Sequence, residues 1–204
     1  MKDLNVDYVD LYLVHWPFAF VKDFGTTAKM ENGFPVRDNV PISETWKEME
    51  KLVKKGLARN IGVSNFGNNQ LKEILEICEI KPVVNQFECH PYLPEFERVE
   101  FCHANDIQIV AYSPFGSGRE PRLLSDTVLN EIAMENNCSV PAVILSWLKS
   151  RGICVIPKSG NKERLQSNLE TIDLSSSQIN RINGIKIQHR YFDSKNYWNI
   201  EYGS

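Results

Sequence analysis

Short runs of β-branched and aliphatic residues alternate along the chain with longer runs in which apolar residues recur at every third or fourth position. The first pattern is typical of buried strands and the second of amphipathic helices. The short runs predict strands at residues 9–14, 58–63, 83–87, 107–112 and 153–156. The longer runs predict helices around residues 42–53, 71–78, 95–105, 126–135 and 140–150, and two more that begin near Asn161 and at Ser175. This alternation predicts a parallel sheet with crossover helices.

Local signals mark several of these boundaries. Ser43 is placed to cap the first helix, and Gly56 is placed to end it. Ser175 and Gln178 have the spacing of a capping box at the start of the last helix. Residues 18–40 are rich in Gly, Pro, Asn and Asp and are predicted to form a loop. Because no linker interrupts the chain, residues 1–204 are predicted to form one domain, either an open doubly wound sheet or part of a barrel.

The composition is that of an ordinary globular chain, with 42% hydrophobic and 24% charged residues. A net charge of -3 without a basic run gives nucleic-acid binding no electrostatic support. No apolar stretch has the length of a membrane span, and the first residues lack the apolar core of a secretion signal.

Cysteine and histidine usage adds two expectations. The five cysteines are odd in number and show no CxxC spacing, so we expect no disulfide framework and a reducing, cytosolic environment, with most of them buried as small apolar residues. His90 and His103 have no partner at the spacing of metal ligands, so no metal site is predicted.

Polar and aromatic residues gather where the predicted strands end. They follow each of the five strands in turn, as His15-Trp16-Pro17, Ser64-Asn65-Phe66, Gln86, Tyr112-Ser113-Pro114 and Pro157-Lys158-Ser159. In parallel α/β folds the carboxyl ends of the strands carry the functional site. A Rossmann fingerprint is not supported, because the Gly116–Gly118 "GSG" meets Pro121 where the third glycine of GxGxxG would stand.

Five segments, in order, resemble strands four to eight of the aldo-keto reductases: "DYVDLYLVHWP", "GLARNIGVSNF", "KPVVNQFECHPYL", "IVAYSPFGSG" and "VIPKSGNKERLQSNLE". The resemblance implies an α/β fold, a partial (β/α)8 barrel, and the NADPH-dependent reduction of aldehydes or ketones. The segment "ISETWKEMEKLVKKG" and the tail "HRYFDSKNYW" resemble the aldose and xylose reductases of this family, so aldoses are among the implied substrates.

At the substrate end, the resemblance assigns two residues. His15 matches the histidine that binds the substrate carbonyl, since an imidazole N–H can orient and polarise that oxygen. Trp16 matches a tryptophan of the substrate pocket. The alternatives are a core histidine with its hydrogen bonds satisfied and ordinary aromatic packing. The loop Phe18–Val40, with Phe18, Phe20, Phe24 and Phe34, and the tail Tyr191–Trp198 are expected at the same mouth or packed on the barrel rim.

The resemblance also assigns the nicotinamide end of the cofactor. Ser64, Asn65 and Gln86 match the residues that bind the carboxamide, whose donors and acceptors such side chains can complement. Tyr112 matches the residue that stacks on the ring. A turn or helix cap remains the alternative for Ser64 and Asn65, and a buried aromatic for Tyr112.

At the adenosine end, Lys158 and Arg164 match the cations that hold the 2′-phosphate and favour NADP over NAD. The remaining assignments are Ser113, Phe115 and Ser117 along the pyrophosphate, Asn168 at the adenine, and Ser159 and Asn161 between the two cations at a helix start, itself an anion site. The alternative is a solvated, charged helix face. Gly160 stands where xylose reductases carry an asparagine, which argues against dual use of NAD.

The family's proton donor, a tyrosine tuned by a lysine and an aspartate, belongs to the first three strands and has no counterpart here. The sequence is therefore expected to be N-terminally truncated, with the edges of its first and last strands exposed. Two functions follow: an NADPH-dependent reductase of small carbonyl substrates, whose activity as the present chain is in doubt, and a non-catalytic NADP-binding or regulatory module of the same fold. An open-sheet protein with an unrelated ligand is a third, weaker reading. The oligomeric state cannot be read from the sequence.

Overall fold

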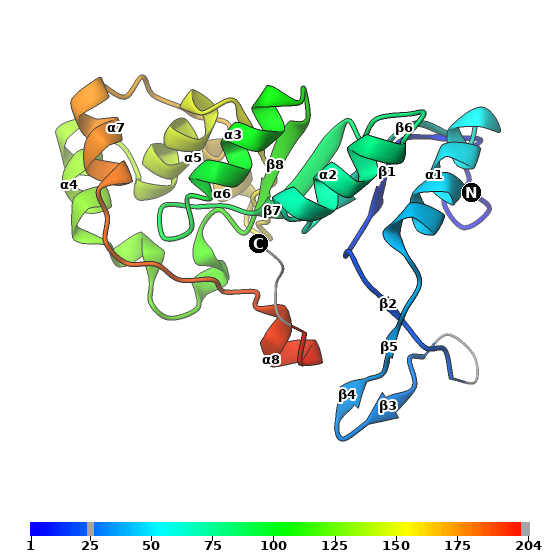
Figure 1. The fold of residues 1–204 in the computed structure, drawn as a ribbon. Helices are drawn as coiled ribbons and strands as arrows, with labels where there is room; N and C mark the ends of the chain where they lie inside the picture. Colours follow the sequence, from blue (N-terminus) through cyan, green and yellow to red (C-terminus); the bar gives the residue numbers. More distant parts are fainter. Residues whose placement is uncertain (24–26, 201–204) are drawn as a thin grey trace. The chain divides into compact units, whose positions relative to one another are not determined.

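The chain divides into two compact units. The computed structural model describes residues 1–23 and 27–200. The first unit comprises residues 1–85, 101–107 and 193 onward, and the second comprises residues 86–100 and 108–192. Figure 1 follows the elements of each unit along the chain.

In the first unit, β1 (Val9–Val14) and β6 (Ala58–Ser64) pair in parallel, from Val9 opposite Ala58 to Val14 opposite Val63. The helices α1 (Ile42–Lys54) and α2 (Asn68–Ile77) pack together, and α1 also contacts β6. The core between these elements consists of Trp46, Ile61, Val63, Phe66, Leu71 and Ile74, which are all buried. Trp46 keeps its polar atom satisfied, because its Nε1–H donates to the carbonyl of Ile80 at 3.0 Å.

The start of α1 differs from the prediction. The N-cap is Pro41 rather than Ser43, which lies inside the helix. The carbonyl of Pro41 accepts the N–H of Glu44 at 3.1 Å. The proline ring restricts φ, which is -62° here, and the ψ of 143° keeps Pro41 extended just outside the first turn. The predicted end is confirmed, since Gly56 has a φ of +71° directly after the C-cap residue Lys55.

The stretch predicted as a loop contains two small antiparallel ribbons. β2 (Ala19–Phe20) pairs with β5 (Arg37–Asp38), and β3 (Met30–Glu31) pairs with β4 (Phe34–Pro35). Between β3 and β4, Asn32 and Gly33 both have positive φ angles, 49° and 83°, as a type I′ hairpin turn requires. The prediction of an irregular loop was therefore wrong for this part of the chain.

In the second unit, β8 (Gln108–Tyr112) and β9 (Ile153–Val155) pair in parallel, with Ala111 opposite Val155. Around them lie α4 (Thr127–Glu135), α5 (Val140–Ser150), α6 (Lys162–Ser167), α7 (Ser176–Asn183) and the 3₁₀ helices η1 (Gly116–Gly118) and η2 (Leu123–Ser125). α5 is buried from Ala142 to Leu148 and contacts both α4 and β9. The capping box of Ser175 and Gln178 is confirmed.

One strand and one helix have residues in both units, and a last helix follows near the chain's end. β7 (Val84–Glu88) and α3 (Phe96–Ala104) each contribute residues to both units, and α8 (Ser194–Trp198) belongs to the first. The hydrogen-bonded strand order is β1-β6-β7-β8-β9, so in the described chain β1 and β9 are the outer strands, as predicted. On β1, Leu11 and Tyr12 are exposed.

The cysteines are all free, but only Cys89 and Cys102 are buried, so the expectation that most of them are buried was wrong. Within residues 1–23 and 27–200, no three His, Cys, Asp or Glu side chains are arranged to hold a metal ion. Among the same residues, no helix combines the length and the apolar character needed to cross a membrane.

Gly62 is required where β6 passes its neighbours. A Cβ atom there would lie 2.7 Å from the carbonyl oxygen of Val84 and 2.8 Å from the Cδ2 atom of Leu13. We predict that Gly62→Ala lowers the free energy of unfolding by about 1–3 kcal/mol, the usual cost of overpacking. Urea unfolding followed by circular dichroism measures this change.

Gly160→Ala is the matched control, because a Cβ atom at Gly160 meets nothing within 4 Å. It should shift the free energy of unfolding by less than about 0.5 kcal/mol. Equal stabilities of the two variants would contradict the close approach of Gly62 to Val84.

Candidate functional site

The first group of predicted site residues lies at the carboxyl ends of β1 and β6. Because these strands are parallel and Val14 is opposite Val63, His15 and Ser64 follow at the same end. The Nδ2–H of Asn65 donates to the backbone carbonyl of His15 at 3.0 Å and to the Oγ atom of Ser64 at 3.2 Å. Ser64 and Asn65 are buried, whereas His15 is exposed. The structure thus brings His15 to the adjacent residues Ser64 and Asn65, which are far from it in the sequence.

Asn65 adopts the left-handed backbone conformation, with a φ of 63°. Asparagine tolerates this conformation better than most residues. The chain therefore turns sharply after β6, and the side chain of Asn65 returns toward the loop after β1. The turn given as the alternative reading of Asn65 is therefore present, and its amide bonds back to the carbonyl of His15. The helix cap is not, because the N-cap of α2 is Gly67.

An aromatic cluster adjoins His15 in the first unit. The ring of Trp16 lies 6.1 Å from that of His15 and 4.7 Å, edge-on, from that of Trp198 in α8. Phe18 and Phe20 lie 5.5 Å and 6.0 Å from Trp198. The sequence pointed to both segments, the 18–40 stretch and the tail, without showing that they meet. Phe24 lies outside the described residues.

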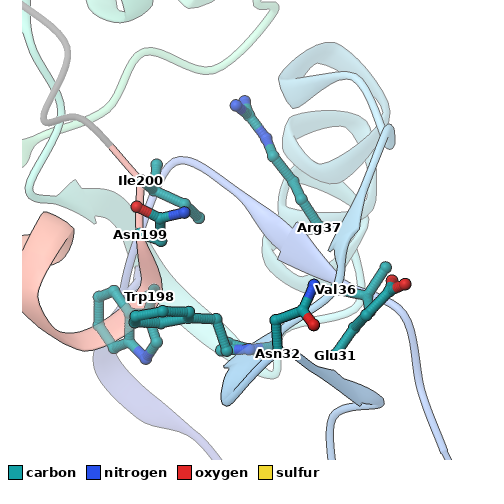
Figure 2. A pocket seen from close by; sticks show the side chains of 9 residues that line it. Glu31, Asn32, Val36, Arg37, Trp198, Asn199 and Ile200 are labelled. Carbon is teal, nitrogen blue, oxygen red and sulfur yellow. The ribbon is translucent and has the colours of Figure 1, made fainter.

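A pocket of about 460 Å³ opens on the same unit, between the β3–β4 ribbon and the tail. Figure 2 shows Asn32 and Glu31 of the ribbon, Arg37, and Trp198, Asn199 and Ile200 of the tail around it. Phe34 also lines this pocket. Its wall mixes the aromatic rings of Phe34 and Trp198 with charged and amide groups.

The second group of predicted residues lies in the second unit, where Gln86 belongs to β7 and Tyr112 is the last residue of β8. After Tyr112 the chain makes a compact loop in which Ser113 and Ser117 have positive φ angles of 50° and 55°. The hydroxyl of Ser117 donates to that of Ser113 at 3.1 Å, which closes the loop on itself. The loop is thus built from the residues that the sequence assigned to the pyrophosphate.

A pocket of about 370 Å³ in the second unit gathers the residues predicted for the adenosine end. Its lining includes Phe115, Lys158, Ser159, Asn161, Arg164 and Asn168. Neither Lys158 nor Arg164 forms an ion pair with any residue in the described part of the chain. Two unpaired cations on the wall of one pocket are suited to an anionic ligand.

Asn161 and Asn168 also have local roles in this pocket. The Oδ1 atom of Asn161 accepts the N–H of Arg164 at 2.8 Å and so caps α6, while Asn168 ends the helix. The Oγ atom of Ser159 accepts the N–H of Asn161 at 3.1 Å. These bonds fix the turn from which Arg164 projects, because they hold the backbone on both sides of Gly160.

Sequence reasoning missed the contribution of Glu88, Arg119 and the tail residues Tyr191 and Phe192 to this second group. Phe192 meets Tyr112 edge-on, with ring centroids 5.8 Å apart. Burial raises the pKa of the Tyr191 hydroxyl to about 12, and the nearby Glu88 carboxylate adds to the shift. No local motif marks these residues, since each acts on a partner that is distant in the chain.

Comparison with known proteins identifies the family. The model of the "Aldo/keto reductase family" matches residues 1–187. The chain belongs to the aldo/keto reductase family. Its relatives within the family include aldose reductase C of Dictyostelium discoideum, 45% identical over 93% of this chain and 61% of the relative. Aldo-keto reductase family 1 member A1 of Mus musculus is 36% identical over 94% of this chain and 62% of its own length.

Solved aldo/keto reductase structures have the same fold. The structure is similar to that of an aldose reductase from Giardia lamblia, with a TM-score of 0.92 and 36% identity over 100% of this chain and 71% of that one. The aldose reductase of Schistosoma japonicum gives a TM-score of 0.89 at 35% identity, over 98% of this chain and 66% of that one. The predicted α/β, TIM-barrel-like fold is confirmed. The chain spans less than two thirds of the length of aldose reductase C of Dictyostelium discoideum and of the Mus musculus relative.

We predict that Asn65→Asp lowers the free energy of unfolding by about 1–3 kcal/mol, because the new carboxylate cannot donate to the carbonyl of His15. Aspartate also tolerates the left-handed conformation, so the change adds no backbone strain, and the loss combines the missing hydrogen bond with the cost of a buried charge. Urea unfolding at neutral pH measures the difference.

Asn5→Asp serves as the control, since Asn5 is exposed and has a similar φ of 51°. It should leave the stability within about 0.5 kcal/mol of the parent chain. A loss at Asn5 as large as that at Asn65 would rule out the bond to His15 as the cause.

Proposed function

We propose that this chain carries the NADP(H) site and the carbonyl-binding histidine of a reductase that converts aldehydes or ketones to alcohols, with aldoses among the candidate substrates. The observation that carries the proposal is the pocket of the second unit, where Lys158 and Arg164 have no ion pair within the described residues. The 2′-phosphate of NADP fits these two cations because it is an anion. NAD lacks this phosphate, so the site would favour NADP. The aldose reductases among the relatives support the carbonyl chemistry.

We propose roles for the groups at the strand ends in binding the rest of the cofactor, on the family resemblance of each residue. Ser64, Asn65 and Gln86 offer amide and hydroxyl groups to a carboxamide, and Tyr112 offers a flat ring. When bound, NADPH supplies the hydride. His15 is exposed at the end of β1, so its imidazole is available to donate to a carbonyl oxygen and to orient the carbonyl for attack. Trp16 and its aromatic neighbours supply an apolar wall beside it.

The turnover that we propose for this chain by itself is limited by the protonation of the product. A reduced carbonyl leaves an alkoxide that needs a proton, and the family's tyrosine, lysine and aspartate have no motif counterpart in this sequence. Loss of a general acid typically costs about 10²–10⁴-fold in rate. We therefore propose NADPH binding with slow or absent turnover for the 204 residues alone. Cofactor binding in a regulatory module of the same fold would share this behaviour.

The proposed setting is the cytosol, with a small carbonyl compound as the partner. The five cysteines are free, as is usual in a reducing compartment. No nucleic-acid surface is proposed, since the net charge is -3.

We predict that Arg164→Gln raises the dissociation constant for NADPH about 10- to 100-fold, since it removes one charge-assisted contact to the 2′-phosphate. The affinity for NADH, which lacks this phosphate, should change less than about twofold. Titrations followed by quenching of tryptophan fluorescence measure both constants.

Lys162→Gln is the matched control, because Lys162 lies on the same helix, carries the same charge and does not line the pocket. It should leave NADPH binding unchanged. If the parent chain does not bind NADPH, or if it binds NADH equally well, the proposed cofactor is wrong. NADPH oxidation with a panel of short aldehydes separates a reductase from a non-catalytic module.

A further inference from the structure

A buried carboxylate at the end of β7 holds the C-terminal tail in the second unit. Glu88 is fully buried, and its Oε1 atom accepts the Nε2–H of His90 at 2.9 Å and the backbone N–H of Tyr191 at 2.8 Å. Its Oε2 atom accepts the backbone N–H of Phe192 at 2.9 Å. One side chain thus fixes two consecutive amides that lie more than a hundred residues further along the chain.

The electrostatic balance keeps this carboxylate ionised at neutral pH. Burial alone raises the pKa of Glu88, but the hydrogen bond from His90 and the two backbone N–H groups outweigh it and hold the pKa below its usual value. A buried charge persists only where hydrogen bonds replace its lost hydration. The tail is therefore held by charge-assisted bonds, which are stronger than neutral ones.

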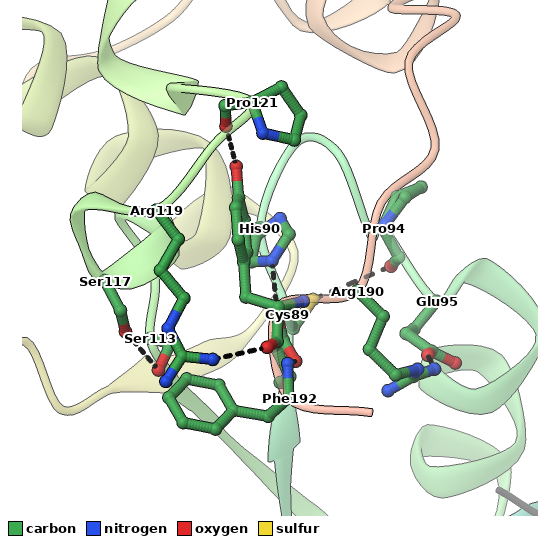
Figure 3. Close-up of polar contacts among 12 residues, drawn as sticks. Cys89, His90, Pro94, Glu95, Ser113, Ser117, Arg119, Pro121, Arg190 and Phe192 are labelled. Carbon is green, nitrogen blue, oxygen red and sulfur yellow. Dashed lines mark hydrogen bonds and ion pairs between the residues drawn. The ribbon is translucent and has the colours of Figure 1, made fainter. Parts of the chain in front are cut away.

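Tyr191 connects Glu88 to the loop that follows β8. Its ring lies directly against Gly116, where an added Cβ atom would fall 2.6 Å from the ring, and its hydroxyl donates to the carbonyl of Pro121. Gly116 lies inside the loop that the bond between Ser113 and Ser117 closes, and both serines are visible in Figure 3. The loop therefore rests on a ring whose backbone N–H is bound by Glu88.

Phe192 connects Glu88 to Tyr112. The two rings meet edge-on, with centroids 5.8 Å apart. The guanidinium of Arg119 lies 4.5 Å from the centroid of the Phe192 ring, and Figure 3 shows these two side chains next to each other. The same guanidinium donates to the carbonyl of Tyr191 at 2.8 Å. Phe192 is thus clamped from one side by Arg119 and contacts the ring of Tyr112, while its N–H is held by Glu88.

Both sets of contacts end at residues that the family resemblance assigns to the cofactor: Tyr112 at the nicotinamide and the Ser113–Ser117 loop at the pyrophosphate. We propose that Glu88 is a positioning residue for NADP(H), which fixes Tyr112 and this loop through the tail residues Tyr191 and Phe192. The inference rests on the proposed function, but it adds a residue that does not itself touch the cofactor. Lys158 and Arg164 form no hydrogen bond or ion pair with Glu88, Tyr191 or Phe192 in the described residues, although Phe115 of the loop also lines their pocket. The affinity that these two cations provide should therefore be independent of Glu88.

This independence provides the test. In Glu88→Gln the volume is kept, but the amide NH₂ group cannot accept a hydrogen bond, so at least one tail N–H loses its partner. We expect the dissociation constant for NADPH to rise about tenfold or more, and that for adenosine 2′,5′-bisphosphate, which has only the adenosine end, to stay within about twofold. Glu100→Gln, an exposed acid-to-amide change on α3, is the control and should alter neither constant.

Phe192→Leu is the second variant, because it removes the ring contacts and leaves the backbone N–H to Glu88 in place. It should show the same selective loss of NADPH affinity, and it decides the question if Glu88→Gln does not fold. Equal weakening of both ligands in either variant would mean a merely structural role and would overturn the proposal. Unchanged NADPH affinity in both variants would overturn it too. Failure of the parent chain to bind NADPH would instead reject the proposed function, and this inference with it.

Discussion

The parallel hydrogen-bonded register of the strands is the constraint on which both parts of the candidate site depend. With Val14 opposite Val63, the chain leaves β1 and β6 at the same level, and His15 comes beside Ser64 and Asn65. With Ala111 opposite Val155, Tyr112 and the segment that leads to Lys158 also leave β8 and β9 at one end. A shift of either register by one residue would turn these side chains to the opposite face of the sheet. The strand pairing within each unit therefore sets the relative positions of the site residues that follow its strands.

Immediately after the strands, the chain is held in conformations that cost energy. Asn65, Ser113 and Ser117 all have φ angles between 50° and 63°. Each such residue costs on the order of 1–3 kcal/mol unless its surroundings determine it. Two hydrogen bonds offset this cost. One runs from the Asn65 amide to the carbonyl of His15, and the other joins the hydroxyls of Ser113 and Ser117. Sharp turns of this kind let short side chains and backbone groups face a ligand at the sheet edge.

The sequence predicted the long periodic elements and the residues at strand ends, because both leave local patterns. It failed where structure depends on partners that no local pattern marks. The two-residue strands β2 to β5 are too short to show alternation, although Asn32-Gly33 is a recognisable hairpin turn. Pro41 displaced Ser43 as the cap because a proline at that position already fixes the extended backbone. The link from Glu88 to Tyr191 and Phe192 spans more than half the chain, so only the fold reveals it.

Under the proposed function, the second unit binds the two ends of the cofactor through different sets of contacts. Lys158 and Arg164, which lie in a pocket around α6, would hold the remote end of the dinucleotide, where no reaction occurs. Tyr112 and the following loop are supported by a different set of contacts, which begins at Glu88 and passes through the tail. Binding energy from a remote group can hold a reacting group in place only if the surface that receives it is rigid. A buried charge with three hydrogen-bond donors supplies that rigidity, because moving the tail would leave the charge unsolvated in the interior.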